Sequence, residues 1–289
     1  MKPKTKPAFI KNINKILPFS HLGPAQILVV GFLVIIIIGA CLLSLPIASK
    51  NNQSTPLIDA FFTATSAVCV TGLVVVNTYA HWTLFGKVVI ISLIQIGGLG
   101  FMTLVSMIFV LLGKKITLRD RLIMQEALGQ NTTAGIVKFT MQIVKGTLLV
   151  EIVGALLLTT RFVPEYGFIK GIAYSVFHSI SAFCNAGFDI IGADNLTPYR
   201  GDIVLNLTIM GLIILGGLGF GVWIDLINGV KTKLKERGKF TWKQIFDRLS
   251  LHTKLVVTIT TYLIVIGFVF FFIAEYSNIN TLGVLSLKD

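Results

Sequence analysis

Five apolar runs, each long enough to cross a bilayer as one helix, alternate with polar segments along the 289-residue chain. Such a crossing needs about 20 consecutive apolar residues. The predicted spans are Ala25–Pro46, Lys87–Leu112, Phe139–Thr160, Ile203–Val230 and Leu251–Glu275. Two further apolar stretches, Leu57–Leu73 and Tyr174–Phe188, are too short to cross and end in small residues and a glycine. Each predicts a half-crossing, in which a short helix enters the membrane and an extended segment returns to the same side.

The two half-crossings repeat one sequence pattern. At a fixed offset of 115 residues, Phe62 matches Phe177, Ser66 matches Ser181, Ala67 matches Ala182, Cys69 matches Cys184 and Gly72 matches Gly187. Gly39 and Gly154, in the spans that precede the half-crossings, stand at the same offset. The motif Gly-Gly-Leu-Gly-Phe occurs at 97–101 and again at 216–220, an offset of 119, so four residues are inserted before its second copy. Gly267 takes the place of Gly39 and Gly154 in the last span, which indicates the start of a third copy.

The sequence therefore predicts an all-α membrane protein built from repeated units around a pore, each an outer helix, a re-entrant pore helix and an inner helix. Two units are complete, and a third contributes its first helix. The expected segments are a basic cytoplasmic arm 1–23, repeat A 24–113, a connection 114–136, repeat B 137–231, a connection 232–250, and the start of repeat C 251–289. The third loop glycine would fall beyond Asp289, so we expect the chain to be a truncated form of a longer one.

Local signals mark two helix starts. Thr55 before Pro56 predicts an N-cap for the first short helix, with Asp59 in its first turn. Thr117 and Asp120 have the spacing of a capping box, which predicts a short amphipathic helix in the first connection.

Composition and charge agree with a membrane location. Hydrophobic residues make up 54% of the chain and charged residues 13%, against about 25% charged in soluble proteins. Nineteen of the 25 lysines and arginines lie in residues 1–23, 113–145 and 230–254, which alternate with the predicted outside segments. Because basic connections stay in the cytoplasm, we expect a plasma-membrane protein with its N-terminus inside. The net charge of +12 then reflects topology and contact with anionic lipid, and not nucleic-acid binding.

The segments that follow the short helices are candidate ion-binding loops. A pore helix that enters from outside points its negative C-terminal end at the membrane centre, which favours a cation there. Extended backbone carbonyls can replace the water around a dehydrated ion, and glycine permits backbone conformations that other residues avoid. The candidate filter residues are Cys69, Val70, Thr71 and Gly72 in the first loop and Cys184, Asn185, Ala186 and Gly187 in the second.

Side-chain roles in these loops are weaker candidates. The Thr71 hydroxyl is a possible ligand, but Ala186 holds the matching position, so only the carbonyl role is shared. We interpret Cys69 and Cys184 as packing residues behind the filter. With Cys41 they show no metal or disulfide spacing, and no pattern indicates a cofactor.

Four segments carry a more specific resemblance: Val68–Leu73, Asn185–Phe188, Gln95–Phe101 and Ser250–Leu255. They resemble the membrane subunit of the Ktr potassium-uptake system, in the Trk/Ktr/HKT superfamily of cation transporters. The resemblance covers nearly the whole chain and is weakest in the N-terminal arm.

This resemblance implies four units around one pore, one glycine in each filter strand, and potassium transport that is often sodium-dependent, as in a symporter. It also implies a homodimer and a cytosolic nucleotide-binding ring that gates the flux. Mapped onto this chain, the filter segments are Cys69–Gly72 and Cys184–Gly187.

Three polar residues in apolar segments have both a functional and a structural interpretation. Glu151, in the third span, is a functional candidate because a carboxylate at membrane depth is costly, but a hydrogen bond to a pore helix would also account for it. Asp225 could attract cations at the cytoplasmic mouth or be a solvated helix end. His178, in the second short helix, is interpreted as structural.

Other functions fit less well. A water channel built on half-helices would contain paired Asn-Pro-Ala turns, and the sequence has none. An intramembrane enzyme would need a metal motif such as His-Glu-x-x-His, or a nucleophile with a base, and neither is found, so we expect no enzyme. The Gly-Gly-Leu-Gly-Phe motifs lack the strand that precedes a dinucleotide-binding loop, and we predict instead that their glycines let an inner helix approach a pore helix closely. A non-conducting remnant of a transporter and a related Na⁺/K⁺ permease remain open alternatives.

Overall fold

The structure, a computed structural model, describes residues 23–100, 116–129, 132–192, 195–235, 246–276 and 278, together with 103, 105–107 and 110. The predicted basic arm 1–23 lies outside these residues except for Gly23, as do residues 236–245 and 279–289. Within the described part, all regular secondary structure is helical apart from one isolated bridge between Ser49 and Trp82. The chain forms two compact units: Met1–Leu149 with Ala186–Phe188, and Val150–Asn185 with Asp189–Asp289.

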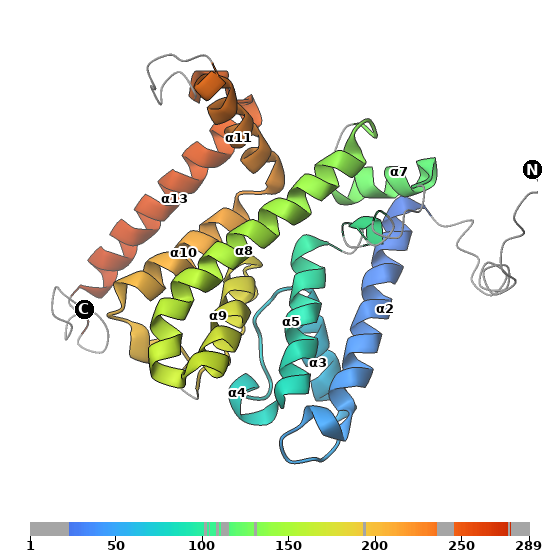
Figure 1. Cartoon of the computed structure of the whole chain (residues 1–289), viewed down its shortest axis with the longest axis vertical. Coiled ribbons are helices and arrows are strands. Elements are labelled where there is room, and N and C mark those ends of the chain that lie inside the picture. The colour runs from blue at the N-terminus through green and yellow to red at the C-terminus, as the bar shows by residue number, and fades with distance from the viewer. Residues whose placement is uncertain are drawn as a thin grey trace, which may run out of the picture. The chain divides into compact units, whose positions relative to one another are not determined.

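The first unit contains α2 (Pro24–Ser44), η2 (Pro46–Ala48), α3 (Leu57–Val68), α4 (Thr78–His81), α5 (Leu84–Leu99), α7 (Leu118–Ala127) and the first part of α8 (Ile136–Tyr166) (Figure 1). The short helix α3 packs against both α2 and α5. Gly39 of α2 makes this packing close, because an added Cβ would lie 2.7 Å from Leu93 of α5 and 3.3 Å from Ala64 of α3.

The helix α7 packs against the beginning of α2. Its buried residues Ile123 and Met124 form a small core with Ile136, and Ile27 and Leu28 of α2 pack against this core. The predicted capping box is confirmed: Thr117 is the N-cap, and Asp120 bonds back to the Thr117 N–H at 2.9 Å. The short helix expected in the first connection is thus present.

The second unit contains the rest of α8, α9 (Phe168–Phe183), η3 (Thr197–Tyr199), α10 (Ile203–Gly217), α11 (Phe220–Lys235) and α13 (Leu251–Glu275). Its helices repeat the arrangement of the first unit. Gly154 of α8 takes the place of Gly39, since an added Cβ would lie 2.6 Å from Ser179 Oγ of α9 and 2.8 Å from Leu212 of α10. The pairs Ala64/Ser179 and Leu93/Leu212 keep the offsets of 115 and 119 found in the sequence.

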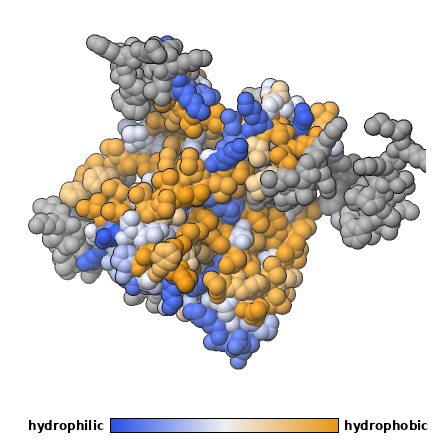
Figure 2. All heavy atoms as spheres, viewed as in Figure 1, coloured by the Kyte–Doolittle hydropathy of each residue, from blue (hydrophilic) through white to orange (hydrophobic). Residues whose placement is uncertain are grey.

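Three described helices are long and apolar enough to cross a membrane: α2, α8 and α13. The pair α10 and α11 would make a fourth span but is bent by 100°. Large apolar side chains stay exposed along these helices, for example Leu149 on α8 at 64% and Phe270 on α13 at 66%, and hydrophobic residues cover much of the surface seen in Figure 2. An exposed apolar surface of this kind is suited to lipid, and the chain is a multi-pass membrane protein.

Two local expectations were wrong. We predicted one uninterrupted span over Ile203–Val230, whereas the helix ends at Gly217 and restarts at Phe220. The break lies at Gly219, whose φ of 85° is a left-handed conformation, and the Trp223 indole donates to the Leu215 carbonyl at 2.9 Å near the break. The same correction applies to the uninterrupted span predicted over Lys87–Leu112, because α5 ends at Leu99 and the matching Gly100 has a φ of 79°.

The second wrong expectation concerns the start of α3. The N-cap is Pro56, which has no side chain able to cap, and not Thr55. The Thr55 hydroxyl instead lies 2.9 Å from His81 Nε2, so it joins the segment before α3 to the end of α4. Asp59 does lie in the first turn of α3, as predicted.

Candidate functional site

The first candidate loop leaves the end of α3 and is held from behind by Ser66. The Thr71 N–H donates to the Ser66 carbonyl at 3.0 Å. The Ser66 side chain is buried, and its Oγ lies 2.8 Å from Thr71 Oγ1 and donates to the Leu73 carbonyl at 2.7 Å. The Thr71 hydroxyl is therefore engaged with Ser66, which favours the carbonyl role for Thr71 over the hydroxyl role.

The second candidate loop leaves the end of α9 and is anchored by Asn185 and His178. The Asn185 side-chain amide donates to the Phe183 and Ile213 carbonyls at 3.4 and 3.3 Å. His178 Nδ1 lies 2.7 Å from the Tyr174 carbonyl, and its Nε2 accepts the Ile190 N–H at 3.5 Å. These contacts agree with the structural interpretation of His178, which joins α9 to the segment after the loop.

Both loops have the same unusual backbone. Val70 and Asn185 are 115 residues apart and have φ of 49° and 59°, while Gly72 and Gly187 have φ of 74° and 70°. A positive φ is costly for a β-branched residue such as valine, so its presence indicates a constrained loop. Among the described residues, no hydrogen bond is donated to the carbonyl oxygens of Val70, Thr71, Gly72, Asn185, Ala186 or Gly187. Within the described part of the chain, the two loops thus share their backbone conformation and six matched carbonyl oxygens without a hydrogen-bond donor.

Within the first unit, the segment Ala186–Phe188 lies against Gly72. A Cβ added to Gly72 would lie 2.6 Å from the Ala186 carbonyl oxygen and 3.3 Å from Gly187 Cα. Ala186 is fully buried and Phe188 is 2% exposed. Gly72 therefore combines a left-handed backbone with a close approach of two chain segments, whereas Gly187 has the left-handed backbone and an ordinary contact.

Glycines of the two Gly-Gly-Leu-Gly-Phe motifs pack against the ends of the short helices from which the loops leave. Gly97 of α5 lies on the carbonyl of Val68, the last residue of α3, and Gly216 of α10 lies on the carbonyl of Phe183, the last residue of α9. In both places an added Cβ would overlap the carbonyl oxygen. The prediction that these glycines let an inner helix approach a short helix is confirmed at Gly97 and Gly216.

Glu151 and Asp225 lie away from the loop segments in sequence, but the Glu151 carboxylate is close enough to Cys184 of the second loop to interact with it electrostatically. Glu151 is 5% exposed in α8, and its backbone carbonyl accepts the Ser179 hydroxyl of α9 at 2.7 Å. Asp225 of α11 accepts the Ser250 N–H at 2.9 Å, at the start of α13. The contact of Asp225 indicates a role in joining two helices.

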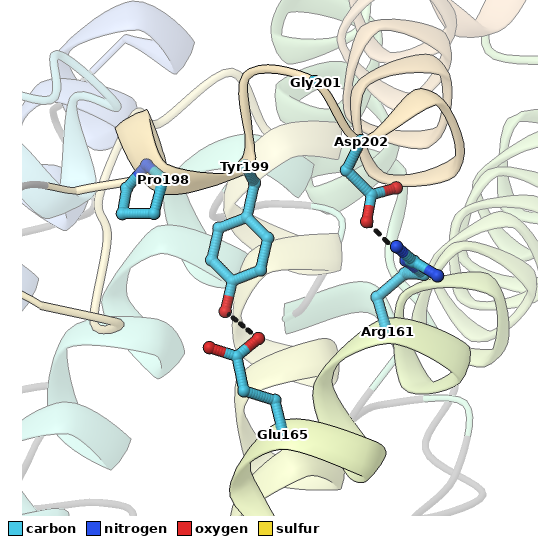
Figure 3. Close-up of a pocket in the computed structure, with 6 residues that line it drawn as sticks. All are labelled: Arg161, Glu165, Pro198, Tyr199, Gly201 and Asp202. Atoms are coloured by element: carbon cyan, nitrogen blue, oxygen red, sulfur yellow. Dashed lines mark hydrogen bonds and ion pairs between the residues drawn. The ribbon is translucent and has the colours of Figure 1, made fainter.

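Sequence reasoning missed a polar site in the second unit, shown in Figure 3. Asp202, the N-cap of α10, accepts the Leu205 N–H at 3.0 Å and pairs with the Arg161 guanidinium of α8. Beside them the Tyr199 hydroxyl donates to the Glu165 carboxylate at 2.6 Å. These residues, with Pro198 and Gly201, line a pocket of about 310 Å³. The separation of 41 residues between Arg161 and Asp202 gave no local signal in the sequence.

Charge and burial act together on two groups of this pocket. Burial, the largest single effect, acts to raise the pKa of Asp202, but the Leu205 N–H and the Arg161 side chain together hold that pKa below its ordinary value. The pKa of Tyr199 is raised, first by burial and then by its hydrogen bond to Glu165. Asp202 is therefore ionised and Tyr199 neutral at neutral pH.

Comparisons of the sequence with known proteins give consistent matches. Residues 9–286 match the family model TrkH, described as "Cation transport protein". The chain is 45% identical over 276 residues to Ktr system potassium uptake protein B of Bacillus subtilis, covering 96% of this chain and 58% of that protein. It is 40% identical over 260 residues to the potassium/sodium uptake protein NtpJ of Enterococcus hirae, covering 90% and 54%.

A third relative is Ktr system potassium uptake protein B of Vibrio alginolyticus, 39% identical over 264 residues, with 91% of this chain and 55% of that protein covered. The chain spans somewhat more than half the length of these curated relatives. The family match covers most of the chain, including both candidate loops, and it indicates transport and not enzymatic chemistry. The chain therefore belongs to the TrkH family of cation transport proteins.

Proposed function

We propose that this chain supplies part of the ion pathway of a potassium-uptake system in a bacterial plasma membrane. Dehydrated K⁺ is bound by backbone carbonyls of Cys69–Gly72 and Cys184–Gly187. The observation that carries this proposal is the matched pair of loops, in which the same two positions have positive φ and the carbonyls after the cysteines accept no hydrogen bond within the described part of the chain. Carbonyl oxygens in such a loop can replace a hydration shell.

The helices before the loops add electrostatic support. The last turns of α3 and α9 end directly before Cys69 and Cys184, and a helix C-terminus carries about half a negative charge. We infer that repeats A and B each contribute an outer, a pore and an inner helix around the ion path. The N-terminus then lies in the cytoplasm. The resemblance stated above extends this proposal to a homodimer gated by a cytosolic nucleotide-binding ring.

Two alternatives differ in activity and not in family. A Na⁺/K⁺ permease is favoured by one relative, which is named a potassium/sodium uptake protein. A non-conducting remnant is the other alternative. About four such loops make a carbonyl ring, and a remnant would stay inactive even when a relative supplies the other loops. These alternatives make different predictions in one experiment.

The experiment replaces the matching residues of the Bacillus subtilis relative with this chain and expresses the chimera in a bacterium that lacks potassium uptake. The chimera should restore growth at micromolar K⁺, and Rb⁺ uptake should exceed Na⁺ uptake. Expressed alone, the 289-residue chain should not restore growth. Chimera uptake that does not distinguish Rb⁺ from Na⁺ would favour the permease, and a folded but inactive chimera would favour the remnant.

The chimera with Gly72→Ser tests the filter assignment. A side chain at this position meets the Ala186 carbonyl and requires a left-handed backbone, so we expect the preference for K⁺ over Na⁺ to fall. Gly211→Ser is the matched control, because Gly211 lies in α10 with nothing within 4 Å of an added Cβ. An unchanged ion preference in Gly72→Ser would refute the assignment.

A further inference from the structure

In each repeat, the N-cap residue of the inner helix makes a polar contact with the last part of the outer helix or with the segment that follows it. In the first unit Thr83 is the N-cap of α5, and its hydroxyl donates to the Ile47 carbonyl at 2.7 Å, just after α2. In the second unit Asp202 is the N-cap of α10 and pairs with Arg161 of α8. Thr83 and Asp202 are 119 residues apart, the same offset as the two glycine motifs. The equivalent contact between the outer and inner helices is thus made by neutral hydrogen bonds in one unit and by an ion pair in the other.

Asp202 caps α10, and α10 is also the helix that contacts the residues on either side of Cys184 in the second loop. Gly216 of α10 lies on the Phe183 carbonyl, and the Ile213 carbonyl accepts the Asn185 side chain at 3.3 Å. A shift of α10 along or away from α8 therefore moves the groups that hold the residues on either side of Cys184. Along α8, Gly154 contacts α10 at Leu212, and Arg161 adds a second attachment two turns further along.

We propose that Arg161 and Asp202 are positioning residues for the second loop, and that their ion pair holds α10 where its Gly216 and Ile213 support Cys184–Gly187. The part of this inference that concerns K⁺ selectivity rests on the proposed function, whereas the mechanical part does not. Asp202 is suited to this role because its side chain is 9% exposed and interacts with both the Leu205 N–H and Arg161. The Arg161 side chain is 47% exposed, so its replacement leaves no buried cavity.

The native cysteines provide a direct readout. Cys184 is buried at 8% exposure, directly after α9, and Cys41 and Cys69 are exposed. Replacing Cys41 and Cys69 with alanine leaves Cys184 as the single thiol. Its reaction rate with a small methanethiosulfonate reagent, measured on the full chain in membranes, reports how often the loop region opens. The rate is measured in K⁺ and in Na⁺ buffers at equal ionic strength.

Asp202→Asn and Arg161→Gln should each raise the Cys184 reaction rate about two- to fivefold, the range that a partly exposed ion pair supports through local opening. Asparagine still caps a helix, so Asp202→Asn removes the charge and keeps the bond to the Leu205 N–H. The double variant should react no faster than either single variant, because both remove one interaction. Arg161→Lys, which keeps the charge, should react at close to the parent rate.

Thr83→Val is the matched control, since it breaks the equivalent contact of the first unit and should leave the Cys184 rate unchanged. Unchanged rates in both Arg161→Gln and Asp202→Asn would overturn the proposal, as would an increase in Asp202→Asn without one in Arg161→Gln. If K⁺ slows the reaction more than Na⁺ in the parent, that difference should shrink in both variants. Equal parent rates in the two buffers would instead contradict ion binding by these two loops alone, while the comparison of variants would still decide the mechanical role.

Discussion

Gly72 and Gly187 lie backbone to backbone, so that a Cβ added to Gly187 would be 3.5 Å from Gly72 Cα. The approach is closer in the other direction, where a Cβ on Gly72 would be 2.6 Å from the Ala186 carbonyl. The two glycines are 115 residues apart and both have a positive φ. Substitution at Gly72 should therefore be more costly than at Gly187, although both have the same backbone conformation.

Gly72→Ala should destabilise the folded chain. The left-handed backbone costs an L-residue about 1–2 kcal/mol, and the close carbonyl adds strain. We expect a lower midpoint of thermal unfolding for the purified protein in detergent. Gly211→Ala, in an open position of α10, should leave the midpoint unchanged or raise it, because alanine favours helix more than glycine does. Equal midpoints for Gly72→Ala and the parent would contradict the close approach.

Alanine substitutions at the neighbouring Gly216 and Gly217 should have different effects on the stability of the fold. An added Cβ at Gly216 overlaps the Phe183 carbonyl, whereas nothing lies within 4 Å of one at Gly217. Gly216→Ala should thus cost about 1–3 kcal/mol, as overpacking usually does, and force α10 away from α9. Gly217→Ala should be close to neutral. Thermal unfolding of the two variants side by side measures the difference, and equal losses would show that α10 does not rest on the end of α9.

The internal repeat carried most of the predictive power of the sequence. Offsets of 115 and 119 residues pair Gly72 with Gly187 and Gly97 with Gly216 in the sequence alone. The first pair shares a positive φ, and the second pair shares a close approach to the last carbonyl of a short helix. The capping box at Thr117 was predictable because it depends on two residues one helical turn apart. Signals of this kind are local or repeated, and a single sequence displays them directly.

Three features were not predictable from the local sequence patterns. The 100° bend between α10 and α11 requires Gly219 to take a positive φ, while hydropathy stays high through the break. The pair of Arg161 and Asp202 has no charged counterpart in the first unit, where the residues at the matching offsets are Pro46 and Thr83. The Thr55 prediction failed because the hydroxyl found a partner in His81, far along the chain.

The ion pair predicts a pH dependence of stability. The folded-state pKa of Asp202 is lowered, so its contribution is fully present above the unfolded pKa and is lost as pH falls through the folded pKa. The parent should therefore be more stable than Asp202→Asn at pH 7, and the gap should close below about pH 4, the ordinary range of an aspartate. Thermal unfolding of both proteins across this pH range measures the gap. A gap that stays constant would show that the charge of Asp202 contributes nothing.

Orientation in the membrane is the remaining prediction, and it follows from the distribution of basic residues. Gln53, between η2 and α3, should face the outside, and Glu126 of α7 should face the cytoplasm. Both side chains are exposed, and neither makes a cap, so Gln53→Cys and Glu126→Cys on a background without native cysteines should fold normally. A membrane-impermeant thiol reagent added to intact cells should label Gln53→Cys alone and should label Glu126→Cys only after the membrane is opened. The reverse pattern would place the candidate loops on the cytoplasmic side, where α3 and α9 would enter from the inside and uptake through the loops would begin at the opposite face.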